Sequence, residues 1–203
     1  MEPGSRFVTI EEMIQDALRS RRDAFILIPI VMLAAAAAQL GMGRKLWGIS
    51  GTPGLWSGDI WSSHNSQFLF DPYTFTHITH GVLLYAFLTL AFKTLPVSTR
   101  LLLAVGLESA WEVFENTTLV IERYRAETIS LNYYGDSIVN SMGDILACMI
   151  GFILASRLPK RVTALGVVGL EILLVVWTRD NLALNLVMLI HPSRAIRIWQ
   201  IGR

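Results

Sequence analysis

The sequence has little charge and almost no cysteine for its length. Only 16% of its 203 residues are charged, whereas 53% are hydrophobic, and the mean hydropathy is +0.48. The single cysteine, Cys148, lies in an apolar run and excludes an internal disulfide. This composition is clearly more apolar than that of ordinary soluble domains, and it predicts a membrane protein.

Signatures of nucleic acid and nucleotide binding are also missing. The 17 basic and 16 acidic residues nearly cancel and form no long basic run, which gives no reason to expect a nucleic acid partner. No phosphate-binding loop of the GxxxxGKS or GxxxxGKT type occurs, so nucleotide-driven work is not indicated. No cleavable signal peptide is expected, because the first apolar run begins near Ala24, after a charged segment.

Long apolar runs are present instead, and a bilayer core needs roughly 20 apolar residues per helix. Five candidate spans lie at about 24–40, 76–93, 100–120, 136–157 and 162–178. Before them, "TIEEMIQDALRSRR" predicts an amphipathic surface helix in which Thr9 and Glu12 form a capping box. The last apolar stretch, "NLALNLVMLIHP", is too short to span a bilayer before Pro192, so we expect an interfacial or re-entrant helix there.

We therefore expect an all-α fold, a polytopic transmembrane helical bundle in which residues 1–203 form one membrane domain with a polar core at about 50–156. Basic residues indicate the cytoplasmic ends of the spans: Arg19, Arg21, Arg22, Lys93, Arg100, Arg157, Lys160 and Arg161. This pattern predicts a multi-pass protein of the bacterial plasma (inner) membrane, with a cytoplasmic N-terminus and membrane lipids as its partners. Arg194 and Arg197 would fall on the opposite side and leave the side of the C-terminus open.

Three glutamates interrupt the third apolar run, in "GLESAWEVFENTTL". At 3.6 residues per turn, Glu108, Glu112 and Glu115 lie on one helix face within roughly 60 degrees. A charge in the hydrocarbon core costs at least ~2.5 kcal/mol on insertion scales. These side chains must therefore face partners inside the bundle.

The second and fourth runs offer those partners. His77 and His80 lie three residues apart, on one face of the second run. In the fourth run Asp136, Asn140 and Asp144 recur every four residues, again along one face. Under the predicted orientation the three stripes occupy overlapping depths in the outer half of the membrane.

Imidazole and carboxylate groups that converge in a bundle are the usual ligands of a divalent metal such as zinc, manganese or iron. The predicted ligand set is His77, His80, Glu112, Glu115 and Asp136. Other interpretations stay open, because HxxH lacks the glutamate and the spacing of HExxH and could reflect structural hydrogen bonds. The carboxylates could likewise relay protons or tie helices together.

Four further polar residues lie outside these stripes. Glu171, alone in the fifth run, either pairs with a neighbour or completes the site. His64, Asp71 and His191 are interpreted as solvated loop residues near the outer surface.

Three segments carry a resemblance to known proteins: "FTHITHG", "ESAWEVFENT" and "YYGDSIVNSMGD". Through them, and over roughly residues 50–156, the chain resembles a family of small bacterial inner-membrane proteins of unknown function. The acid and asparagine pattern in successive helices also loosely resembles VanZ-like envelope proteins, and the histidine pair is similar to those of membrane-embedded metal-dependent hydrolases. These likenesses imply no catalytic role for a particular residue.

The leading functional hypothesis is a metal-assisted hydrolase or transferase that acts on a lipid or envelope substrate. The ion would lower the pKa of a bound water, and Glu108 or Asp144 would serve as general base. One alternative is an ion- or proton-coupled transporter, and another is a structural or assembly subunit. The inner halves of the spans contain few polar residues, which favours the enzyme over the transporter.

Overall fold

The computed structural model describes residues 21–48, 51–130 and 132–202. Its helices are α2 (Arg21–Gly41), α3 (Thr74–Ala91), α4 (Val97–Glu115), α5 (Thr118–Glu127), α6 (Ile138–Arg157), α7 (Lys160–Thr178), α8 (Leu182–Ile190) and α9 (Arg194–Ile201). No strand occurs within these ranges, only an isolated bridge between Trp56 and Phe70. The predicted all-α fold is confirmed, whereas the expected amphipathic helix before residue 21 lies outside the described residues.

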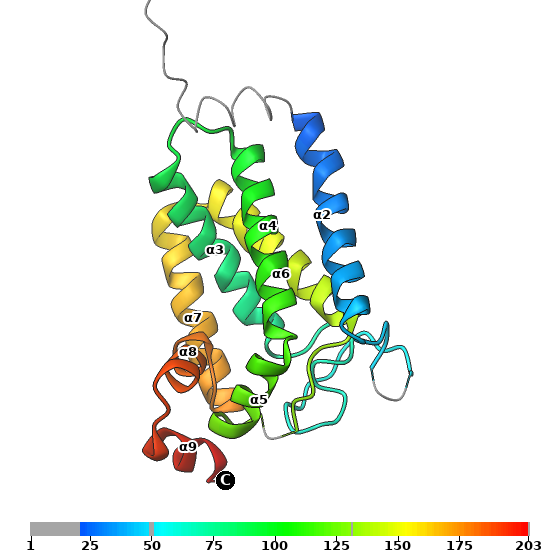
Figure 1. Ribbon diagram of the computed structural model, residues 1–203. Helices are drawn as coiled ribbons and strands as arrows, with labels where there is room; N and C mark the ends of the chain where they lie inside the picture. Colours follow the sequence, from blue (N-terminus) through cyan, green and yellow to red (C-terminus); the bar gives the residue numbers. More distant parts are fainter. Residues whose placement is uncertain (1–20, 49–50, 131, 203) are drawn as a thin grey trace, which may run out of the picture.

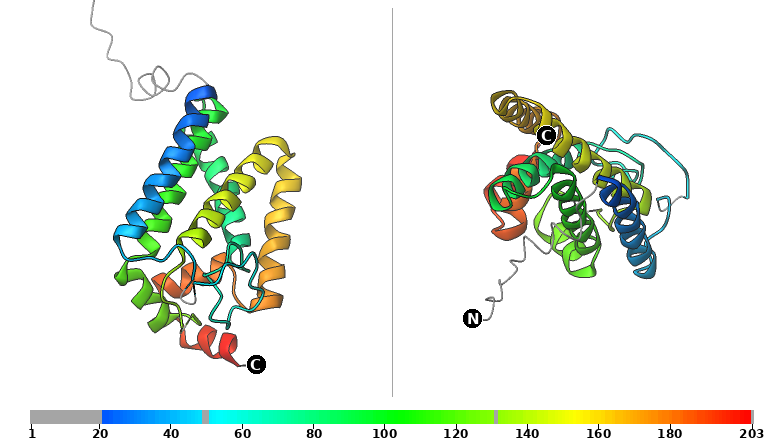
Figure 2. Two further views of the ribbon diagram at one scale, coloured as in Figure 1. Left: turned by 90° about the vertical axis from the view of Figure 1, so that its right-hand side faces the viewer. Right: turned by 90° about the horizontal axis from the view of Figure 1, so that it is seen from above.

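The long helices α2, α3, α4, α6 and α7 run between the two ends of the molecule (Figure 1). The segments 42–48 and 51–73 and the short helices α5, α8 and α9 gather at one end, which we call the loop end. The left view of Figure 2 shows the same separation. At the opposite end only short turns join α3 to α4 and α6 to α7, so the irregular backbone is concentrated on one side of the bundle.

Four helices of the described chain, α2, α3, α6 and α7, are long and apolar enough to cross a membrane. They present large apolar side chains outward, such as Phe25 at 81% and Val176 at 78% exposure. Contiguous apolar surfaces of this kind are rare on soluble monomers and normal against lipid. Helix α4 has 19 residues and runs among them, but it carries the acidic stripe, whose Glu108 and Glu112 are buried inside the bundle.

One predicted boundary is wrong. The third run was expected to continue to residue 120, but α4 ends at Glu115 and α5 begins at Thr118. The break occurs because the Asn116 side chain donates to the Glu112 carbonyl at 2.9 Å and Thr117 is extended. The short helix expected after Asp180 is present as α8, and a further short helix that was not predicted, α9, follows after His191 and Pro192.

Helices α3 and α6 form the tightest pair in the bundle. A Cβ atom placed on Gly81 would lie 1.9 Å from the Cys148 carbonyl oxygen, and one on Gly151 would lie 1.9 Å from the Ile78 carbonyl oxygen. Each glycine therefore lets the backbone of the opposite helix approach closely, as small residues do in membrane bundles. This contact sets the distance between the histidine stripe of α3 and the acidic stripe of α6.

The segment 42–48 is held on the first turn of α6. Lys45 and Leu46 accept hydrogen bonds from the backbone N–H groups of Ile138 and Val139, at 2.9 and 3.1 Å. Ser137 caps the helix through its side chain, which accepts from the Asn140 N–H. These bonds satisfy N–H groups that have no partner within the helix, and they fix the loop against the polar stripes.

Toward the opposite end the stripes give way to apolar side chains. One buried cluster comprises Ala24, Ile28, Leu102, Val105 and Ile145. A second comprises Leu88, Ala104 and Phe152. Val105 precedes Glu108 by one helical turn and Ile145 follows Asp144 directly, so apolar packing closes the bundle next to the polar site.

Candidate metal centre

Both histidines of α3 contact the same glutamate of α4. The Nδ1 atom of His77 lies 2.6 Å from Glu108 Oε1, and the Nδ1 atom of His80 lies 3.0 Å from the same oxygen. Glu108 is 3% exposed, so the contact is shielded from solvent. A carboxylate on one ring nitrogen orients the imidazole and leaves Nε2 available, which is the arrangement that metal-ligating histidines usually show.

Two further carboxylates, those of Glu112 and Asp144, lie close to the two ring nitrogens of His77. His77 Nε2 is 3.8 Å from Asp144 Oδ2, and Glu112 Oε1 is 3.4 Å from His77 Nδ1, whose proton is directed to the closer Glu108. Glu112 is 1% exposed and Asp144 is 4% exposed. Within the described parts of the chain, neither oxygen of Glu112 nor Oδ1 of Asp144 has a hydrogen-bond partner, which is costly for buried carboxylates.

A third group of acids lies at the start of α6. Asp136 Oδ2 accepts hydrogen bonds from the Tyr133 hydroxyl at 2.9 Å and from the Asn116 amide at 2.8 Å. Asn116 Oδ1 in turn accepts from the Asp136 backbone N–H at 2.7 Å. Burial raises the pKa of Asp136 to about 6, although these two donors favour its charged form. Glu115 completes this group at the end of α4.

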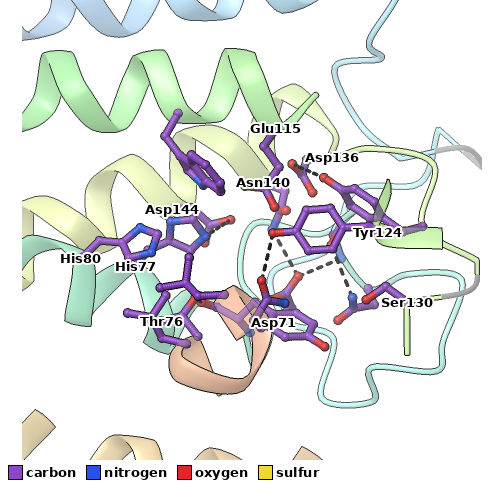
Figure 3. Close-up of a pocket in the computed structure, with 18 residues that line it drawn as sticks. Asp71, Thr76, His77, His80, Glu115, Tyr124, Ser130, Asp136, Asn140 and Asp144 are labelled. Atoms are coloured by element: carbon purple, nitrogen blue, oxygen red, sulfur yellow. Dashed lines mark hydrogen bonds and ion pairs between the residues drawn. The ribbon is translucent and has the colours of Figure 1, made fainter. Parts of the chain in front are cut away.

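These side chains surround a cavity that opens near the loop end (Figure 3). Its volume is about 60 Å³ for the centres of water-sized molecules, and a single water needs roughly 10–15 Å³ on this scale. Its lining includes His77, His80, Glu115, Asp136 and Asp144, whereas Glu108 and Glu112 lie behind the lining. The cavity can hold ions and a few waters, but not a whole lipid headgroup.

The structure brings all seven predicted site residues together. Their ligand atoms form three groups, each with all atoms within 4.8 Å of one another. The groups are His77, His80 and Glu108; His77, Glu112 and Asp144; and Glu112, Glu115 and Asp136. The distances are compatible with a divalent ion, because neutral imidazole and carboxylate oxygen bind such ions at roughly 2.0–2.2 Å.

The interpretation of Asp71 as a solvated loop residue is wrong. Asp71 is 1% exposed, lines the cavity and accepts from the backbone N–H groups of Ser66 and Tyr73, both at 2.8 Å. Burial raises its pKa despite these bonds. His191 is exposed, as expected, and the half-buried His64 ring stacks on Phe68. Asp71 thus orders the loop next to the site through these hydrogen bonds. Its position in the sequence, next to Pro72, did not indicate that it is buried.

Glu171 does not belong to the site. Its Oε2 atom accepts from the Ala183 backbone N–H at 3.3 Å, at the start of α8. A carboxylate is favourable at the first turn of a helix because it satisfies a free N–H and meets the positive end of the helix dipole. The first alternative, pairing with a neighbour, is therefore confirmed.

Asp180 is a buried acid that the sequence patterns did not single out. Its oxygens accept from the Tyr73 hydroxyl at 3.2 Å and from the Gln200 amide at 3.1 Å. The bonds connect the end of α7 to the cavity wall and to α9, although these segments are far apart in the sequence. Burial nevertheless raises the pKa of Asp180 to about 6.

We expect Asp180→Asn to gain stability relative to the parent protein as pH rises from about 4 to about 6. The folded-state pKa of Asp180 lies above the ordinary aspartate value of 3.8, so the folded state binds this proton more tightly and loses that advantage as pH rises through about 6. The difference should reach about 3 kcal/mol at most, because one pKa unit corresponds to about 1.4 kcal/mol. Thermal unfolding in detergent across this range measures it.

Asp59→Asn, in the exposed loop, is the control for the loss of one carboxylate and should fold like the parent protein. A difference between Asp180→Asn and the parent that stays constant across this pH range would contradict the assigned titration of Asp180.

A second and larger cavity adjoins the first at the loop end. It has a volume of about 300 Å³ on the same scale and shares Asn65, Ser130 and Tyr133 with the first cavity. The rest of its lining is aromatic, aliphatic, hydroxyl or amide: Ile60, Trp61, Ser62, Ser63, Gln67, Ile129, Asn132 and Tyr134. No residue in this lining is charged.

Fold and site together define a helical protein of the membrane type, with a histidine and carboxylate cluster carried by α3, α4 and the first half of α6 with the residues just before it. A family model described as "Protein of unknown function (DUF2585)" matches residues 39–202. The UPF0314 protein of Brucella anthropi is 45% identical over 177 residues, which cover 87% of this chain and 90% of the relative. That of Paracoccus denitrificans is 47% identical over 171 residues, covering 84% and 89%.

The chain therefore belongs to this bacterial family, DUF2585 or UPF0314, and the predicted resemblance to a family of unknown function is confirmed. A further relative, the UPF0314 protein of Sinorhizobium fredii, is 51% identical over 161 residues, covering 79% of this chain and 82% of the relative. No solved structure matches the chain. The looser likeness to VanZ-like proteins stays a prediction.

Proposed function

We propose that this protein is a metal-assisted hydrolase or transferase of the bacterial inner membrane that acts on a lipid or envelope substrate. One observation carries the proposal. Neither oxygen of the buried Glu112, nor Oδ1 of the buried Asp144, has a hydrogen-bond partner among the described residues, and both carboxylates lie within 4 Å of a ring nitrogen of His77.

A divalent ion would compensate the cost of burying these groups. Carboxylate and imidazole donors suit zinc, manganese or iron, and the ion would lower the pKa of a bound water toward neutrality. The two histidines would keep their orientation through Glu108, because their Nδ1 atoms both contact Glu108 Oε1. The geometry thus supports Glu108 as a positioning group rather than a general base, and Asp144 as a ligand.

The second cavity supports a large neutral substrate group. It is uncharged and partly aromatic, it adjoins the ion site, and it is about five times larger than the first cavity. Aromatic, hydroxyl and amide side chains together bind groups that have both apolar and hydrogen-bonding surface. With the N-terminus in the cytoplasm, as the basic residues predict, both cavities would face outward.

Transport is the weaker alternative. A transported ion needs polar groups along its whole path. Here the two apolar clusters around Val105 and Phe152 pack next to the acidic stripe on the side away from the loop end. The path would have to cross buried side chains that offer no ligand.

Metal analysis of detergent-purified protein tests the proposal. We expect near-stoichiometric zinc, manganese or iron in the parent protein and its loss in a Glu112→Gln, Asp144→Asn variant, which keeps the side-chain sizes but removes the charged ligands. Glu122→Gln, on the exposed face of α5, should retain the metal. Parent protein that takes up none of these ions after reloading would overturn the proposal.

A further inference from the structure

We propose that the centre holds two divalent ions, with Glu112 as the carboxylate that bridges them. The inference rests on the proposed function, since it extends the metal site already described. Two of the ligand groups share Glu112: one contains His77 and Asp144, and the other contains Glu115 and Asp136. Each group offers three ligand atoms within 4.8 Å of one another, which is enough for an ion that also keeps bound water.

Glu112 suits a bridging position because of its burial and its free oxygens. It is 1% exposed, and no hydrogen-bond donor within the described ranges reaches either of its oxygens. A single ion can bind one carboxylate oxygen and leave the other without a partner. A carboxylate that bridges two ions binds one ion with each oxygen. A bridge therefore satisfies both oxygens and explains why α4 carries Glu115 one turn beyond Glu112.

The number of carboxylates in the cluster also favours two ions. Four carboxylates, those of Glu112, Glu115, Asp136 and Asp144, belong to the two groups. No lysine or arginine lines the cavity, and Glu108 already serves both histidines. With these four carboxylates ionised, one divalent ion would leave two negative charges uncompensated in a buried site, whereas two ions would balance all four.

The hydrogen bonds around Asp136 also leave room for a ligand. The Tyr133 hydroxyl and the Asn116 amide both donate to Oδ2, so Oδ1 is available for an ion. Hydrogen bonds that orient a carboxylate in this way are typical of the residues around metal sites. Figure 3 shows Glu115 and Asp136 at one side of the cavity, with His77, His80 and Asp144 at the other.

The test is the number of manganese ions bound per chain. Full-length protein is stripped with chelator, reloaded with Mn²⁺ and freed of excess metal, and then examined by elemental analysis and electron paramagnetic resonance. We expect two ions per chain with the spectrum of a coupled pair. Asp136→Asn should bind one ion and show the spectrum of isolated manganese.

Two further variants make the outcome decisive. Asp180→Asn removes another buried acid outside the cluster and should keep both ions, whereas Glu115→Gln should keep one, and it repeats the test if Asp136→Asn does not fold. One ion in the parent protein, or two in both Asp136→Asn and Glu115→Gln, would overturn the two-ion site and leave the proposed function standing. No bound ion in the parent would overturn both.

Discussion

Gly151→Ala is expected to destabilise the protein by about 3 kcal/mol or more, at the upper end of the range for overpacked cores. The new methyl group would lie 1.9 Å from the Ile78 carbonyl oxygen and 2.8 Å from its carbonyl carbon. Both are backbone atoms, so α3 and α6 would have to move apart. Because His77 lies on α3 and Asp144 on α6, the same movement should weaken metal binding. Thermal unfolding in detergent and metal content together measure the effect.

Gly81→Ala should behave like Gly151→Ala, because its methyl group would lie 1.9 Å from the Cys148 carbonyl oxygen. Gly106→Ala and Gly166→Ala are the matched controls, since a Cβ at either position meets no described atom within 4 Å. Alanine is the better helix former by up to about 1 kcal/mol, so these two should melt at or slightly above the parent temperature. Equal melting of all four variants would contradict the role of the two close contacts.

Glu112→Leu is expected to make the metal-free protein more stable while it abolishes metal binding. A buried carboxylate that no donor reaches costs about 1–3 kcal/mol, and an apolar side chain of similar size removes this cost. Glu112 qualifies because it is 1% exposed and forms no hydrogen bond to a described residue. Its single close contact with a ring nitrogen, 3.4 Å from His77 Nδ1, is weaker than that of Glu108. Unfolding of chelator-treated protein measures the stability.

The same replacement at Glu108, one turn before Glu112, should have the opposite effect on the stability of the metal-free protein. Glu108 accepts from both His77 and His80, so Glu108→Leu leaves the buried His77 ring and the half-buried His80 ring without their acceptor. It should destabilise the metal-free protein by about 3–5 kcal/mol. This contrast separates a functional site from a structural one. If the acids of α4 serve only to tie helices together, both replacements should destabilise. That result would favour the structural or assembly subunit.

The sequence predicted most of the site because helical periodicity places residues on a common face. His77 and His80, the three glutamates, and Asp136 with Asp144 were each assigned to a stripe, and the stripes meet in the structure. The prediction missed Asn116 and Tyr133. Asn116 follows Glu112 by one turn and could have been recognised from its spacing. Tyr133 lies in a loop before Asp136, where no helical repeat indicates which way a side chain points.

The sequence by itself determined the all-helical fold, the apolar helices and the acidic and histidine stripes, because these depend on composition and on the 3.6-residue repeat. Only the tertiary structure decided which carboxylates have partners. Glu108 is satisfied by two histidines, whereas Glu112 is left free one turn later, and Asp71 and Asp180 are buried by contacts with distant segments. The reason is physical: the energy of a buried charge depends on donors that other helices supply, and helix spacing is set by contacts such as those of Gly81 and Gly151.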